Sequence, residues 1–268
     1  MLINEDYLKK EHLMGMEIVR EMTPEEKELE KKKLELATLE AKLAQRELEL
    51  VTFQAELNAF RNRYLQALGG LYAELDAILA DLANIQALKK PAGHQAWKKA
   101  EQARARAEES ARSAKEIKGQ SRNFKPSEKL KKLYREIAKS FHPDLAGNEG
   151  ERAQFQQLMA EANQAYKNGD ERLLEKLFIQ GEHCPESVTG VGTGVDLVRV
   201  IRKIASIEKR LGEIASEMDL LKSSSLYQLN LKYEEMKKKG INLLEEMAGY
   251  LNRQITEACI RLNRAKKN

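Results

Sequence analysis

Residues 127–145, SEKLKKLYREIAKSFHPDL, contain an amphipathic helix that runs directly into a proline turn. Ser127 can cap this helix, because its hydroxyl can accept a hydrogen bond from a free N–H of the first turn. Apolar residues then recur at spacings of three and four and form one stripe: Leu130, Leu133, Tyr134, Ile137, Ala138 and Phe141. Because Pro143 disfavours helical geometry in the residue before it, the pattern predicts a helix that ends at Phe141–His142 and a sharp, rigid loop.

A second amphipathic segment, residues 151–167, follows the loop. Its apolar residues can pack against the stripe of the first helix: Phe155, Leu158, Met159, Ala162, Ala165 and Tyr166. Asn168-Gly169-Asp170 ends this segment, and residues 171–179 form a short third helix. These elements predict a small helical module over residues 126–180.

Two stretches of this module, LYREIAKSFHPDLA (133–146) and ANQAYKNGD (162–170), resemble helix II, the His-Pro-Asp loop and helix III of the J-domain (DnaJ) family. The resemblance is confined to about a fifth of the chain. It implies that His142, Pro143 and Asp144 dock on a DnaK-type heat-shock ATPase, where Asp144 would pair with an arginine. A carboxylate on a proline-stiffened loop loses little entropy in such a pairing.

The resemblance also assigns a set of helix residues to an acidic surface of the same partner: Lys131, Tyr134, Arg135 and Lys139. Attraction between such charges mainly raises the association rate and is screened by salt. For the cations, a solvated helix face is the alternative interpretation, and Tyr134 is also expected in the core.

The module departs from the family pattern in three ways. No tyrosine-rich helix I precedes Pro126, so this helix is missing or replaced by the connector, and packing against the long helices would compensate for the small core. Glu136 stands where the family often has a basic residue, and Met159 where it often has phenylalanine. No Gly/Phe-rich segment, zinc-binding cysteine repeat or β-rich client-binding domain follows, so a general client-holding role has no support.

Residues 24–90, before the module, carry a long coiled-coil pattern. Thr23-Pro24-Glu25-Glu26 is a helix start, with a capping residue, a proline at the first helical position and an acid three residues after the cap. Apolar residues then recur at heptad spacing: Leu36, Leu39, Leu43, Leu50, Phe53, Leu57, Phe60, Tyr64, Leu71, Ile78 and Ile85. A second stripe widens the apolar face in the later half, where we expect contact with more than one helix: Leu68, Leu75 and Leu82.

Two connecting segments flank the module. Residues 91–125 form a basic helical connector, since residues 89–125 hold eleven Lys or Arg against four Glu. These cations and Trp97 also suit a nucleic-acid-binding arm, but one tryptophan gives no stacking series, so nucleic acid is not expected as a partner. The glycine-rich residues 181–194 predict a flexible linker and not a phosphate-binding loop, because no Lys-Ser/Thr follows and no strand precedes.

Residues 195–268 carry a second heptad pattern: Leu197, Val200, Ile204, Ile207, Leu211, Ile214, Met218 and Leu221. The polar break at residues 222–225 leads to a further helix, and such a short connection favours an antiparallel hairpin. β-Branched residues occur at both core positions, so the pattern leaves the oligomeric state open. The two coiled-coil regions either drive homo-oligomerisation or pack together within one chain.

The composition indicates an all-α protein, with long coiled-coil helices flanking a small J-domain-like helical hairpin: 33% of the residues are charged, 6% are aromatic and only 5 are proline. Residues 1–23 contain neither a secretory signal nor a membrane span, so a cytoplasmic protein is expected. Cys184 and Cys259 lie far apart, and the four histidines have no partner at motif spacing. No metal, no cofactor and no enzyme activity are therefore expected.

Two functions fit these patterns. The first is a J-domain co-chaperone, in which the module stimulates ATP hydrolysis by a DnaK-type chaperone and the coiled coils select a client protein, which the sequence does not identify, or a site. The second is a structural coiled-coil scaffold with an inactive J-like module, which the absence of helix I and the presence of Glu136 favour.

Overall fold

The computed structural model describes residues 22–89, 93–116, 124–182 and 192–267, and within these ranges all regular structure is helical. The elements are α2 (Pro24–Leu88), α3 (His94–Glu116), α4 (Glu128–Ser140), the 3₁₀ turn η1 (Pro143–Leu145), α5 (Glu149–Asn168), α6 (Glu171–Glu182), α7 (Thr193–Ser223), α8 (Ser225–Lys238) and α9 (Leu243–Lys267). The all-α prediction is confirmed. The predictions for residues 1–21, for most of the linker (183–191) and for parts of the connector (90–92 and 117–123) lie outside the described residues.

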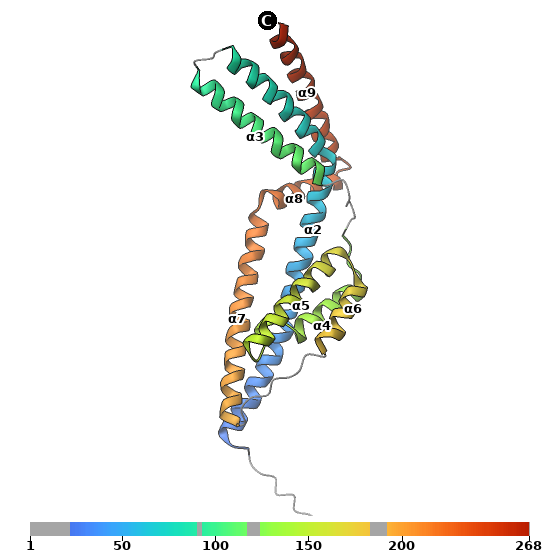
Figure 1. The fold of residues 1–268 in the computed structure, drawn as a ribbon. Helices are drawn as coiled ribbons and strands as arrows, with labels where there is room; N and C mark the ends of the chain where they lie inside the picture. The colour runs from blue at the N-terminus through green and yellow to red at the C-terminus, as the bar shows by residue number, and fades with distance from the viewer. Residues whose placement is uncertain (1–21, 90–92, 117–123, 183–191, 268) are drawn as a thin grey trace, which may run out of the picture.

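Helix α2 is the spine of the molecule. Its start follows the predicted capping box: the Thr23 hydroxyl accepts from the Glu26 amide at 3.2 Å, and the Glu26 carboxylate accepts from the Thr23 amide at 2.8 Å. The helix continues without interruption for 65 residues, which corresponds to about 100 Å. In Figure 1 it runs through most of the length of the molecule, and it contacts α3, α4, α5, α7, α8 and α9.

Helix α7 lies along the N-terminal half of α2 and runs in the same direction (Figure 1). The two heptad patterns interlock, since Leu43 and Leu50 are buried together with Ile207 and Ile214. Further members of both patterns pack at the edges of this seam: Leu36, Leu39, Leu211, Met218 and Leu221. The coiled coil is therefore intramolecular, and the heptad face of α7 is covered within the chain.

The C-terminal region does not form the predicted antiparallel hairpin. Ser224 caps α8, where its hydroxyl accepts from the Tyr227 amide at 3.2 Å, and α8 then contacts α2 through the ring pairs Phe53–Tyr227 and Phe60–Tyr233. Helix α9 continues along α2 in the same direction (Figure 1). The reason is that α8 has no buried residue of its own that could hold it against α7, whereas α2 offers apolar surface along its whole length.

The distal half of α2 packs between α3 and α9, as the second apolar stripe predicted. On one side, α9 places Leu244 and Leu251 against Leu68. On the other side, the connector folds back as α3, where the buried Asp76 accepts from the Ser110 hydroxyl and lies 3.4 Å from Arg106. The connector is thus an arm of a helical hairpin with α2.

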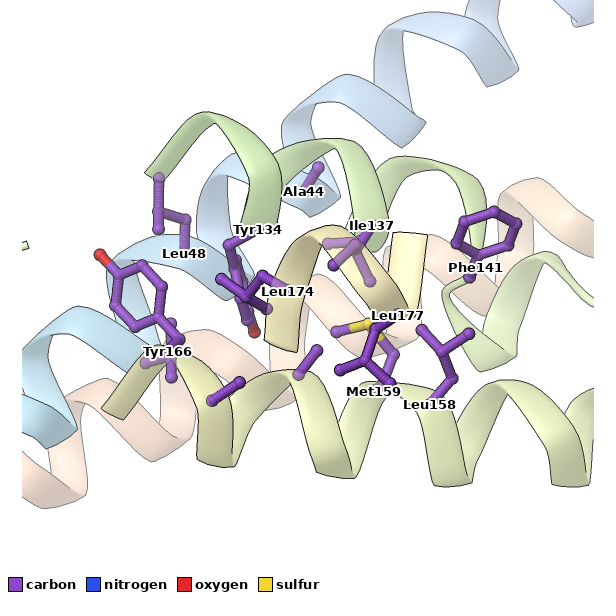
Figure 2. Close-up of a cluster of buried hydrophobic side chains, with 14 of the residues drawn as sticks. Ala44, Leu48, Tyr134, Ile137, Phe141, Leu158, Met159, Tyr166, Leu174 and Leu177 are labelled. Carbon is purple, nitrogen blue, oxygen red and sulfur yellow. The ribbon is translucent and has the colours of Figure 1, made fainter. Parts of the chain in front are cut away.

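The module predicted over residues 126–180 is built from α4, η1, α5 and α6, and α2 completes its core (Figure 2). Helices α4 and α5 are antiparallel, because the ring of Tyr134 contacts that of Tyr166 at one end and the ring of Phe141 contacts that of Phe155 at the other. Three residues of α2 are buried in the same cluster: Ala44, Leu48 and Val51. The long helix therefore supplies part of the apolar core of the module.

Two glycines have different structural roles. Gly169 ends α5 in the left-handed conformation at φ 71°, as the sequence Asn-Gly-Asp indicated. Gly181, which was expected in the linker, lies instead in α6, where an added Cβ would lie 2.6 Å from the ring of Phe141. Close packing of α6 on Phe141 therefore requires a glycine here.

If α2 completes the core of the module, Leu48→Ala should lower the free energy of unfolding by about 2–5 kcal/mol. It should also speed amide hydrogen exchange in α4, α5 and α6, which lie far from Leu48 in the sequence. Leu34→Ala is the matched control, because Leu34 is on the same helix and 74% exposed. Equal effects of the two substitutions on exchange in the module would contradict the assignment.

Candidate functional site

The triplet His142-Pro143-Asp144 lies in the tight turn between α4 and α5. Helix α4 ends at Ser140, and the Phe141 amide makes the last helical hydrogen bond, to the Ile137 carbonyl at 2.8 Å. His142 is extended at φ −73° and ψ 138°, as the residue before a proline must be. Pro143 then opens η1, and the Leu145 amide donates to the His142 carbonyl at 2.9 Å. The loop predicted from Pro143 is therefore present.

The imidazole of His142 is buried inside the chain, with only 5% of the residue exposed. Its Nε2 lies 3.1 Å from the Glu47 carboxylate on α2, and its Nδ1 accepts from the Asp144 amide at 3.2 Å. A neutral ring with its proton on Nε2 satisfies both contacts, since Nδ1 must then be an acceptor. Both ring nitrogens are thus used within the molecule.

Glu47 is a buried carboxylate that joins this loop to α7. In addition to His142 it accepts from Nε of Arg210 at 2.7 Å, and Arg210 in turn donates to Glu217 at 2.8 Å. Burial alone would raise the pKa of the Glu47 carboxyl, but the hydrogen bonds from His142 and Arg210 and the charge of Arg210 hold it below its usual value. The carboxylate is therefore charged at neutral pH and fully engaged.

Asp144 is also held within the chain. Its Oδ1 accepts from the Ser206 hydroxyl of α7 at 3.0 Å, and the Arg152 guanidinium of α5 lies 3.9 Å away. Its side chain is 13% exposed. The next residue, Leu145, is buried in the apolar seam between α2 and α7. Helix α7 therefore covers the loop, and the carboxylate expected to meet a partner arginine already has partners.

The residues predicted on the helix face do not share one environment. Arg135 and Lys139 are exposed, and Lys131 forms an ion pair with Glu128 at 2.8 Å. Glu136 lies 4.0 Å from Lys132, so it offsets part of the basic charge that the family pattern would place here.

Tyr134 is a core residue in this conformation. It is fully buried, and its hydroxyl donates to the Asn163 side chain at 2.6 Å. Burial raises the pKa of this hydroxyl well above its usual value. The side chain thus supports the hairpin of α4 and α5 and is not presented at the surface.

Sequence reasoning missed Glu47 and Ser206, which bond His142 and Asp144, and Arg210, which bonds Glu47. A signal for one pair existed in the heptads. Glu47 lies four residues after the buried Leu43, and Arg210 lies three residues after the buried Ile207, so both flank the apolar seam of the two helices. Charge complementarity across a parallel pair is expected at positions that flank an apolar seam. Nothing in the sequence marks Ser206.

Within the four described ranges no group of three or more His, Cys, Asp or Glu could hold a metal ion. Among the same residues no helix is long and apolar enough to cross a membrane. Comparison of the chain with protein-family models, with curated proteins and with solved structures gives no match.

Removing the Glu47 carboxylate should destabilise the protein. Glu47→Ala is expected to lower the free energy of unfolding in urea by about 2–4 kcal/mol, because the buried His142 loses its partner while Arg210 keeps Glu217. Glu49→Ala is the control, since Glu49 is an acid on the same helix whose side chain is 39% exposed and pairs with its helical neighbours Gln45 and Arg46. A loss of stability no larger than that of the control would show that the buried network contributes little.

The contribution of Glu47 should depend on pH in a defined direction. Because its folded pKa is depressed, the carboxylate stabilises the fold above its unfolded pKa of about 4.3, and this stabilisation is lost as the pH falls through the lower folded pKa. The stability difference between the native protein and Glu47→Gln should be constant above about pH 5 and shrink in acid. Urea titrations over this range measure it, and a difference that grows toward low pH would be inconsistent with the charged network.

Proposed function

We propose that the chain is a J-domain co-chaperone that stimulates ATP hydrolysis by a DnaK-type heat-shock chaperone in the cytoplasm. The observation that carries the proposal is the position of His142-Pro143-Asp144, in a rigid turn between the antiparallel helices α4 and α5. A short, stiff loop that bears an imidazole and a carboxylate is suited to docking, because little conformational entropy is lost on binding.

The exposed cations of α4 support the same proposal. Arg135 and Lys139 lie on the helix that leads into the loop, and both are exposed. An acidic partner surface would attract them over a distance of about one Debye length, roughly 8–10 Å at physiological salt. Such attraction orients the partner toward the loop and mainly raises the association rate. Tyr134 contributes indirectly, by holding α4 on α5.

The rest of the molecule is suited to targeting. Helices α2, α3, α7, α8 and α9 form an elongated support that carries the module at one side (Figure 1). In this proposal the support selects a client protein or a cellular site and so fixes where the ATP-driven partner acts. Homo-oligomers, if they form, would use surfaces other than the seam of α2 and α7, which is occupied within the chain.

A second candidate function is a structural scaffold with an inactive J-like module. It is favoured by the burial of His142 and by the bond of Asp144 to Ser206, since both functional groups here serve the internal packing of the chain. This candidate predicts normal folding and assembly with no effect on a chaperone ATPase.

Single-turnover ATP hydrolysis by a DnaK-type chaperone, with and without this protein, tests the proposal. Stimulation is expected, and it should be lost in Asp144→Asn and His142→Gln without loss of helical content. His94→Gln, on the exposed surface of α3, is the control and should stimulate normally. Stimulation that survives both loop substitutions would rule out docking through this loop.

A further inference from the structure

We infer that α7 is an autoinhibitory helix, which closes over the His-Pro-Asp loop and must separate from it before a DnaK-type chaperone can dock. The inference rests on the proposed function and concerns the regulation of the same site. Docking needs the imidazole of His142 and the carboxylate of Asp144 at the surface. In the structure, however, residue His142 is only 5% exposed and the side chain of Asp144 is only 13% exposed.

The contacts that close the loop come from two helices with different roles. Helix α2 belongs to the core of the module, so its Glu47 can stay with His142 in any state in which the module is folded. Helix α7 contributes nothing to that core. Its contacts are with the loop and with α2: Ser206 bonds Asp144, and Arg210 bonds Glu47. Separation of α7 would therefore release Asp144 from Ser206 and uncover the side of the loop that α7 covers, without unfolding the module.

The N-terminal part of α7, residues 193–203, contains no buried residue, since the buried residues of this helix are Ile204, Ile207 and Ile214. Few buried contacts give low local stability, so this part should open readily. Ser206, which bonds Asp144 in the loop, lies just beyond it.

Closure of this kind reduces apparent affinity in proportion to the open fraction. If a tenth of the molecules are open, the concentration needed for half-maximal stimulation rises about tenfold over that of a permanently open loop. A partner arginine would also compete with Ser206 and Arg152 for the same carboxylate. The closed position of α7 therefore lowers the apparent affinity for the partner chaperone, by an amount that the contacts of α7 determine.

The double variant Ser206→Ala/Arg210→Ala tests the inference in the full-length chain. It removes the bonds of α7 to Asp144 and to Glu47, and the Glu47 carboxylate that it leaves buried without a cation favours opening. Ser216→Ala/Lys209→Ala is the matched control, because it makes the same types of change at exposed positions of the same helix. Ser206→Asp is a second opening variant, which places a like charge against Asp144 without deleting Arg210.

Two readouts are needed: the concentration for half-maximal stimulation of a DnaK-type ATPase, and the rate at which diethylpyrocarbonate modifies His142 relative to the exposed His94. We expect both opening variants to lower that concentration about tenfold and to speed modification of His142, while the control matches the native chain. Equal stimulation by native and opening variants would overturn the inference and leave the proposed function intact. Absence of stimulation from every variant, with His142 modified rapidly in the opening variants, would overturn the proposed function and this regulation with it.

Discussion

The carboxylate of Glu47 joins three parts of the molecule, because it lies on the spine helix and accepts hydrogen bonds from His142 in the loop and from Arg210 on α7. A buried charge is stable only where such partners surround it. The arrangement therefore requires α2, α7 and the module to meet at one point, and that point is beside the turn that carries the candidate function.

The helical period of α2 explains why this meeting point exists. Successive residues are rotated by about 100° around a helix axis, so Leu43 and Leu50 share one side, which faces α7. Ala44 and Leu48 lie on an adjacent side, which enters the core of the module. Glu47 falls between these two sides. A single helix thus completes the core of the module and pairs with α7, and the loop is enclosed as a consequence.

Local signals in the sequence predicted the elements well, and long-range pairing was predicted less well. The capping box at Thr23, the stop at Pro143 and the end at Gly169 depend on backbone chemistry within a few residues, so the sequence alone determines them. The packing of α8 and α9 depends on which apolar helix faces bind best to α2. The length of the connection at residues 222–225, from which the hairpin was predicted, carries no information on that choice. Gly181 was misassigned to a linker because a glycine required for close packing and one required for a turn have the same sequence pattern.

The candidate site shows the same division. Pro143 made the loop predictable, whereas its enclosure arises from residues far away in the chain: Glu47, which only its place beside the heptad residues marks, and Ser206, which nothing marks. Nitrogen-15 NMR of the His142 imidazole tests the enclosed loop most directly. The account predicts a single tautomer, with the proton on Nε2 and an unprotonated Nδ1 that accepts a hydrogen bond from the Asp144 amide. Nitrogen shifts typical of a freely exchanging, solvent-exposed ring would contradict it.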